Sequence, residues 1–286
     1  MITASPLGAQ PGDWRRAFRD AITDPHELLD LLGLPGLAAQ LPADTGSFPL
    51  RVPRGFVARM RPGDPADPLL RQVLPLDEEF RPVPGFATDA VGDLASRGAR
   101  GVLHKYHGRS LLVATGSCAV HCRYCFRRHF PYGEQAAPAD GWRDALDYLR
   151  AHPEVSEVIL SGGDPLSLAT AKLAELAAGL RRLPQVRRLR LHTRLPVVLP
   201  ERVDAELLAW IATLPWPVVL VIHANHAREI DSSVAGALAA LRRVGVRLLN
   251  QSVLLRGVND DVETLAALSE RLFECDVQPY YLHQLD

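Results

Sequence analysis

The chain has 286 residues, of which 47% are apolar and 23% charged, and its net charge at pH 7 is −1. These values are typical of a globular protein with a large core, and the near-neutral charge argues against general binding to nucleic acids or membrane surfaces. The sequence has neither a secretory signal nor an apolar run of the ~20 residues that cross a membrane. We therefore expect a cytoplasmic protein, and four cysteines in a chain of this size do not indicate a disulfide scaffold.

The first hundred residues have the pattern of short helices separated by irregular, proline-rich segments. Apolar spacing predicts helices over residues 14–22 and 26–32. Asp13 and Asp24 precede these helices and are residues typical of an N-cap. We therefore expect residues 1–100 to form a mostly helical N-terminal region.

From residue 101 onward the pattern changes to strands alternating with amphipathic helices. Six strands are predicted, at Ser110–Thr115, Glu157–Leu160, Arg187–His192, Val218–His223, Arg247–Val253 and Gln278–His283. Helices are predicted between them, near 140–151, 168–182, 202–213, 231–243 and 260–274. This alternation predicts an α/β fold with a parallel sheet and right-handed crossovers, a partial (βα)6 barrel over residues 101–286. In such barrels the chemistry gathers on the loops that follow the strands.

Three cysteines with the spacing C-x3-C-x2-C, at Cys118, Cys122 and Cys125, follow the first of these strands. One interpretation is a buried stripe on a helix, because the spacing i, i+4, i+7 would place all three on one face. The polar and cationic side chains around them argue against it. A second interpretation is a [4Fe–4S] cluster, for which thiolates are suitable ligands. Three thiolates would leave one iron without a protein ligand, free to bind a substrate or cofactor.

A zinc site is the third interpretation of the cysteine segment. His129 lies four residues beyond the last cysteine, so a Cys3His tetrahedron is possible from the ligand types. Arg123, Arg127 and Arg128 are interleaved with these residues and could contact phosphates. This alternative is a small nucleic-acid-binding module and not an enzyme.

Polar motifs also follow later strands of the predicted barrel. After the second strand, Gly162 and Gly163 would let the backbone approach a ligand closely, and Asp164 could accept a hydrogen bond from an ammonium group or cap a helix. His223 ends the fourth strand and Gln251 lies within the fifth. Such polar residues in otherwise apolar strands need partners if they are buried.

The cysteine spacing, with an aromatic residue before the last cysteine, resembles the radical S-adenosylmethionine (SAM) superfamily. A closer resemblance, from about residue 50 onward, is to lysine 2,3-aminomutases of the branch that supplies β-lysine for modifying elongation factor P. It implies an isomerase that converts free (S)-α-lysine to (R)-β-lysine, which a separate ligase attaches to the factor. The segments that carry the resemblance are 104–109, 118–132, 160–166, 195–200, 250–256 and 279–281.

The resemblance also implies cofactors and a reducing electron donor. A [4Fe–4S] cluster would be held by Cys118, Cys122 and Cys125, and its open iron would chelate S-adenosylmethionine. The residues expected to line the S-adenosylmethionine site are Tyr124, Gly162, Gly163, Asp164, His223 and Gln251. Another radical SAM amino-acid aminomutase stays open as an alternative, and so does a homo-oligomeric state.

Pyridoxal phosphate (PLP) is the third cofactor that the resemblance implies. Lys105, Tyr106 and Arg109 match the segment that contacts it. Arg127 matches the residue that binds the substrate carboxylate, for which a guanidinium offers a planar pair of donors. Asp286 matches the aspartate that holds the distal ammonium of lysine.

The lysine that binds PLP lies, in the family, in a C-terminal segment beyond the last strand. This chain contains only two lysines, Lys105 and Lys172, and neither matches that residue. We therefore expect that the C-terminal PLP-lysine segment is absent from a truncated chain, and we assign no catalytic residue. Cys275 lies at a predicted helix end, and we expect a structural role for it.

Overall fold

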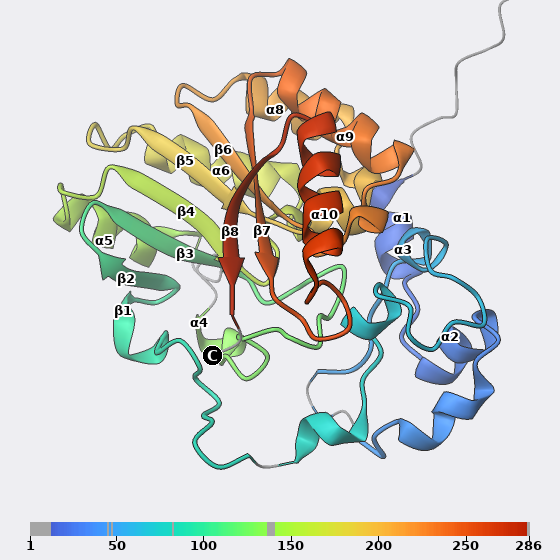
Figure 1. The fold of residues 1–286 in the computed structure, drawn as a ribbon. Coiled ribbons are helices and arrows are strands. Elements are labelled where there is room, and N and C mark those ends of the chain that lie inside the picture. Colours follow the sequence, from blue (N-terminus) through green and yellow to red (C-terminus); the bar gives the residue numbers. More distant parts are fainter. Residues whose placement is uncertain (1–12, 45, 47, 82, 136–140, 285–286) are drawn as a thin grey trace, which may run out of the picture.

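The computed structural model describes residues 13–284, apart from residues 45, 47, 82 and 136–140 (Figure 1). Its centre is one eight-stranded sheet with the strands in the order of the sequence. The strands are β1 Arg97–Ala99, β2 Val102–Tyr106, β3 Arg109–Thr115, β4 Glu157–Gly162, β5 Arg188–His192, β6 Val218–His223, β7 Arg247–Val253 and β8 Gln278–His283. Strands β3 to β8 are parallel, so the six predicted strands are confirmed to within two residues at each end.

Helices connect the parallel strands and cover one side of the curved sheet (Figure 1). The long ones are α5 Arg143–Ala151, α6 Thr170–Leu180, α8 Ala205–Ala212, α9 Ser232–Arg243 and α10 Val262–Glu274. Shorter helices follow the strands, namely α4 Tyr132–Gln135, η6 Pro165–Ser167, α7 Leu195–Val198, η7 Pro200–Arg202 and η8 Ala227–Glu229. The middle strands are buried along most of their length, which explains their nearly continuous apolar sequence. The expected α/β architecture of a partial barrel is confirmed, and hydrogen bonds do not close it, because β1 and β8 are its edges.

A β-hairpin that the sequence analysis did not predict precedes the barrel. Strands β1 and β2 pair antiparallel through a turn at Gly101, whose φ of 70° is one that glycine adopts without strain. Strand β2 then pairs antiparallel with β3, with Leu103 opposite Leu111. This hairpin extends the sheet at the edge where the barrel would otherwise begin.

The N-terminal region is mostly short helices, as expected, and packs beside the sheet (Figure 1). These are α1 Trp14–Arg19, α2 Pro25–Leu31, η1 Pro35–Gln40, α3 Arg54–Val57, η2 Leu70–Gln72, η3 Asp77–Phe80 and η4 Leu94–Ser96. Asp13 and Asp24 cap α1 and α2 as predicted. Trp14, Phe56 and Leu69 belong to the same buried cluster as the barrel residues. A domain boundary at residue 100 stays a prediction.

Among the described residues, no helix is both long and apolar enough to traverse a lipid bilayer.

Candidate active site at the carboxyl end of the sheet

The three cysteines lie in an irregular loop between β3 and α4. The loop consists of isolated turns. In one the amide of Cys125 donates to the carbonyl of Cys122 (3.0 Å), and in another the amide of Arg128 donates to the carbonyl of Cys125 (3.1 Å). The interpretation as a stripe on one helix face is therefore wrong. Cys118, Cys122 and Cys125 are all half-buried, so the loop holds three thiols at the carboxyl end of the first barrel strand.

The spacing of the thiols separates the two metal interpretations. Of the described residues, only His104, His152 and Glu154 bring three ligand atoms within 4.8 Å of one another, so at least one pair of the three cysteine sulfurs lies further apart than that. A single tetrahedral zinc ion with Zn–S bonds of about 2.3 Å would hold its sulfurs closer together, about 3.8 Å apart. In a cubane each thiolate binds a different iron, so the cysteine sulfurs lie further apart than they do around a single zinc ion. His129, the expected fourth zinc ligand, is exposed, and the geometry fits the cluster better than a Cys3His site.

The N-terminal region holds the cysteine loop in place. The backbone amide of His121 donates to the carbonyl of Arg51 at 2.9 Å. The carboxylate of Glu79 forms ion pairs with both Arg123 and Arg128. Since these guanidinium groups are already paired, the loop does not present the cationic surface that the nucleic-acid-binding alternative requires.

Burial makes the cluster-free thiols poor acids. The pKa of Cys118 is raised well above its usual value by burial, and the charges of Asp164 and the other two cysteines add to this effect. Burial and the neighbouring Cys122 raise the pKa of Cys125 to about 11. Both thiols are therefore protonated at neutral pH until iron displaces their protons, as metal binding to cysteine does.

Arg194 is a site residue that the sequence analysis did not identify. Its Nη1 lies 2.8 Å from the Sγ of Cys122, and its Nη2 donates to Gln72 Oε1 at 2.6 Å and Glu229 Oε2 at 2.9 Å. The side chains of Arg194 and Glu229 are 6% and 0% exposed, so they form a buried ion pair beside a cluster ligand. Arg194 comes two residues after β5, which ends at His192, and its position directly after a strand was a signal that could have identified it.

A hydrogen-bond network joins the ends of β6 and β7 to the cysteine loop. The Nδ2 group of Asn225, just after β6, donates to the hydroxyl of Tyr124 at 2.7 Å and to Gln72 Oε1 at 2.8 Å. Asn225 Oδ1 accepts from the amide of Val253 at the end of β7, and its carbonyl accepts from Asn259. Tyr124, predicted to line the S-adenosylmethionine site, is thus positioned by the loops after β6 and β7.

The two glycines after β4 make room for the cysteine loop. A Cβ atom on Gly162, whose φ is 113°, would lie 2.8 Å from the carbonyl oxygen of Thr115, and one on Gly163 would lie 2.5 Å from that of Ser117. The amides of Gly163 and Asp164 donate to these same carbonyls, at 2.6 and 2.8 Å. In this structure it is therefore the backbone of the cysteine loop that approaches the two glycines closely.

Replacing Gly163 by alanine should displace the start of the cysteine loop, since a Cβ atom has no room at this position. Such overpacking costs about 1–3 kcal/mol. We expect a lower free energy of unfolding and fewer irons per chain after anaerobic reconstitution. Gly133→Ala is the matched control, because a Cβ there meets no atom within 4 Å. Equal iron content in the two variants would contradict this account of Gly163.

Asp164 is buried and fully hydrogen-bonded. Its Oδ1 accepts from Thr193 and from the amide of Leu166, which caps η6, and its Oδ2 accepts from the amides of Arg194 and Leu195. Burial raises its pKa to about 6, although these hydrogen bonds lower it. Asp164 therefore ties β4 to the turn after β5, and an ammonium group would have to displace one of its four donors.

His223 and Gln251 lie side by side, as partners in the register between β6 and β7. Gln251 Oε1 is 3.2 Å from Nδ1 of His192, a residue that the sequence analysis did not single out. Burial, followed by the charge of Arg190, lowers the pKa of His192 to about 4, and burial lowers that of His223 well below its usual value. The Nε2 atoms of both neutral imidazoles are buried without a partner among the described residues. Such orphaned atoms fit a site that a polar ligand completes.

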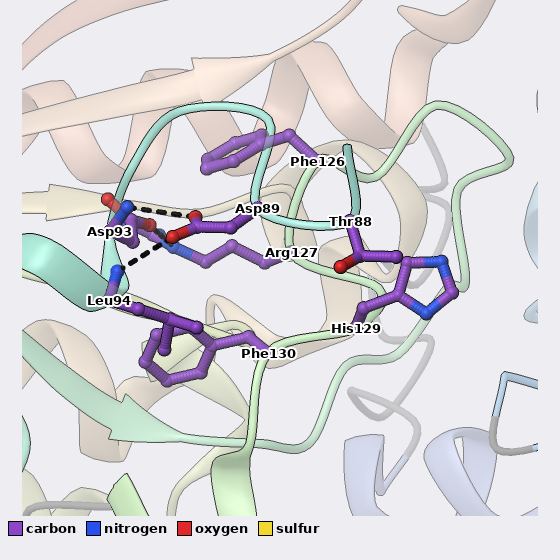
Figure 2. Close-up of a pocket in the computed structure, with 8 residues that line it drawn as sticks. All are labelled: Thr88, Asp89, Asp93, Leu94, Phe126, Arg127, His129 and Phe130. Atoms are coloured by element: carbon purple, nitrogen blue, oxygen red, sulfur yellow. Dashed lines mark hydrogen bonds and ion pairs between the residues drawn. The ribbon is translucent and has the colours of Figure 1, made fainter. Parts of the chain in front are cut away.

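Arg127 lines a pocket between the segments 88–94 and 126–130 (Figure 2). Its Nε donates to Asp93 Oδ2 at 2.7 Å, and its Nη1 donates to Ser161 Oγ at 3.1 Å. The ammonium group of Lys105 lies 2.7 Å from the other oxygen of Asp93. Burial alone would raise the pKa of Asp93, but the charges and hydrogen bonds of Arg127 and Lys105 outweigh it and lower that pKa. Nη2 of Arg127 makes no hydrogen bond within the described part of the chain.

The remaining predicted PLP contacts lie elsewhere. Tyr106 is 59% exposed, and the guanidinium of Arg109 stacks 4.4 Å from the centre of its ring. Both residues are at the turn between β2 and β3, roughly 20 Å from the cysteine loop if β3 is taken as fully extended. The structure thus brings Lys105 and Arg127 together around one carboxylate, but it does not bring Tyr106 and Arg109 to the thiols. Asp286 lies outside the described residues.

Comparison with known proteins agrees with this geometry. Residues 112–268 match the radical SAM superfamily. The chain is 50% identical to L-lysine 2,3-aminomutase of Escherichia coli (strain K12) over 96% of its own length and 80% of the relative's. It is 45% identical to that of Haemophilus influenzae, over 100% and 85% of the two lengths, and 35% identical to that of Clostridium subterminale, over 96% and 66%. Membership of the superfamily implies a [4Fe–4S] cluster and S-adenosylmethionine. The chain belongs to the lysine 2,3-aminomutases, an isomerase family within the radical SAM superfamily.

Proposed function

We propose that this protein converts (S)-α-lysine to (R)-β-lysine and that the product serves the modification of elongation factor P. The observation that carries the proposal is the 50% identity to the Escherichia coli L-lysine 2,3-aminomutase across 96% of the chain. The cysteine loop and its buried surroundings support it, because they offer three thiols to a cubane and leave its fourth corner open.

The proposed roles of the site residues follow from their positions. Cys118, Cys122 and Cys125 would hold the cluster. The cluster, when bound, would supply the electron for the reductive cleavage of S-adenosylmethionine. The neutral imidazoles of His192 and His223, each with a free buried nitrogen, would complete their hydrogen bonds on S-adenosylmethionine. The other residues proposed to contact it are Tyr124, Gly162, Gly163, Asp164 and Gln251.

Arg127 is proposed to bind the carboxylate of lysine. Asp93 and Ser161 fix its guanidinium by two hydrogen bonds, and Nη2 keeps both of its N–H donors for a ligand. A preoriented guanidinium loses little conformational entropy when it binds a carboxylate, which favours a specific and planar contact. Lys105 also pairs with Asp93 and would help to hold the Asp93 carboxylate, and through it Arg127, in place.

PLP dependence is also part of the proposal. The cofactor carries the migrating amino group, and its phosphate requires cationic partners. Lys105 and Arg109 are the predicted cationic contacts. Lys105 pairs with Asp93 beside Arg127, whereas Arg109 lies at the β2–β3 turn. Arg109 is the first residue of β3, so it lies at the end of that strand that is away from the thiols.

The test is an anaerobic assay of the reconstituted full-length protein with lysine, S-adenosylmethionine, PLP and a reductant. We expect β-lysine to form, and we expect none when S-adenosylmethionine or PLP is omitted. Formation of β-lysine without added or bound PLP would contradict the PLP proposal alone. If lysine is inert but another amino acid is isomerised, the substrate assignment is wrong. Transfer of the product to elongation factor P by its ligase tests the final step.

A further inference from the structure

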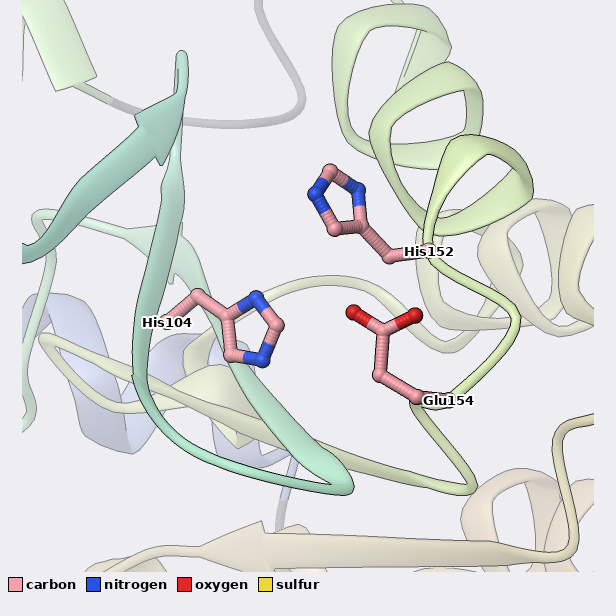
Figure 3. A group of neighbouring side chains, drawn as sticks. All are labelled: His104, His152 and Glu154. Carbon is pink, nitrogen blue, oxygen red and sulfur yellow. The ribbon is translucent and has the colours of Figure 1, made fainter.

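A second cluster of ligand-type side chains lies on the outer side of the sheet (Figure 3). His104 belongs to β2, while His152 and Glu154 lie in the connection from α5 to β4. One ligand atom from each lies within 4.8 Å of the other two. These residues precede β4, whereas the cysteine loop follows β3, so the cluster lies toward the amino ends of the strands, away from the candidate active site.

Hydrogen bonds orient the two imidazoles. Nδ1 of His152 is 2.8 Å from the carbonyl oxygen of Tyr148, which can only accept, so Nδ1 carries the proton and Nε2 has a free lone pair. Nδ1 of His104 is 2.9 Å from the hydroxyl of the same tyrosine. The ring of Tyr148 stacks on that of His152 with centroids 3.9 Å apart. Metal-binding histidines typically have such a partner on the second ring nitrogen, as His152 does. Nδ1 of His104 faces His152 (Figure 3), so an ion bound there would take the place of the tyrosine hydroxyl.

The backbone keeps the two halves of the cluster at a fixed separation. The carbonyl of Gly108, in the turn between β2 and β3, accepts from the amides of Ser156 at 2.9 Å and Glu157 at 3.1 Å. This contact joins the hairpin that bears His104 to the segment that bears His152 and Glu154. Both imidazoles are half-buried and Glu154 is exposed, so an ion could enter from solvent without unfolding the site.

We propose that His104, His152 and Glu154 form a binding site for Zn2+, with water as the fourth ligand. Two imidazoles and a carboxylate are a ligand set that late first-row divalent ions prefer, and three protein ligands leave the fourth position open. Tetrahedral bonds of about 2.0–2.2 Å hold ligand atoms roughly 3.4 Å apart, so the side chains would close in on the ion from separations of at most 4.8 Å. The proposal rests on neither the cluster nor the isomerase activity.

Titration of the cluster-loaded protein with Zn2+ against a chromophoric chelator tests this site, since the cysteines are then occupied by iron. We expect the wild-type protein to bind one Zn2+ per chain. The His152→Ala and Glu154→Gln variants should bind this ion at least about tenfold more weakly. His107→Ala is the matched control, because His107 is an exposed histidine of the same hairpin outside the cluster. Iron content is measured in every variant to show that the fold is intact.

X-ray absorption at the zinc edge provides a second measurement that does not depend on the variants folding. Nitrogen and oxygen neighbours at about 2.0–2.2 Å, with imidazole scattering, support the site. Sulfur neighbours at about 2.3 Å would place the ion on the cysteines and overturn the proposal. It is also overturned if the wild-type protein binds no Zn2+, or if His152→Ala and Glu154→Gln bind it as tightly as His107→Ala does.

Discussion

Replacing Cys122 by alanine should abolish the iron–sulfur cluster and all β-lysine formation. The loop supplies only three thiols, and two cannot hold a cubane that already lacks one protein ligand. The loss also leaves Arg194 Nη1 without the sulfur that it contacts at 2.8 Å. The measurement is iron per chain after anaerobic reconstitution, together with the visible absorbance. We expect about four irons in the wild-type protein and close to none in the variant.

Cys275→Ala is the control for this experiment. Cys275 caps the end of α10, is half-buried and packs against the hydrophobic core, so it contributes to packing and not to the loop. We expect its substitution to leave both the iron content and the activity close to those of the wild-type protein. A Cys122→Ala protein that still carries four irons per chain would refute the assignment of the cluster to this loop.

Most of the barrel strands could be predicted from the sequence because each is a short apolar run that is largely buried, although β8 at the edge is mostly exposed. Val218–His223 is an example, with five of its six residues buried. The hairpin before them could not be predicted in the same way. Its first strand, Arg97–Ala99, has only three residues and includes a glycine, so its pairing with β2 depends on the position of the neighbouring strand and not on its own pattern.

The site was predictable where its chemistry lies in a local motif. The cysteine spacing and the glycines after β4 could be identified in this way. The glycines, however, make room for the backbone of the cysteine loop. Gln72 and Glu229 could not be identified, and the only local signal for Arg194 was its position after β5, because the contacts of all three join distant parts of the chain. Arg194 and Gln72 are 122 residues apart, and Gln72 and Glu229 are 157 apart. Only the folded structure shows that these polar residues surround one thiol.

Arg194→Met should destabilise the protein strongly and make its cluster harder to reduce. Removing one partner of a buried ion pair leaves the Glu229 carboxylate without its counter-charge, which costs about 3–5 kcal/mol of unfolding free energy. The guanidinium also places a positive charge and an N–H donor beside Cys122, and both favour the reduced cluster. We expect the reduction potential to fall by on the order of 60 mV, a tenfold change for a one-electron couple.

Two further variants separate the effect of Arg194 on stability from its effect on the cluster. Arg228→Met breaks a similar ion pair, that of Arg228 with the buried Asp67 (2.7 Å), and should lower stability without changing the potential. Adding Glu229→Gln to Arg194→Met removes the uncompensated charge but keeps the Oε1 acceptor for the amides of Asn225 and His226. The double variant should therefore recover stability while its potential stays low, because the group that contacts Cys122 is still missing. A potential that returned with stability, or that fell equally in Arg228→Met, would show that Arg194 acts on the cluster only by keeping the protein folded.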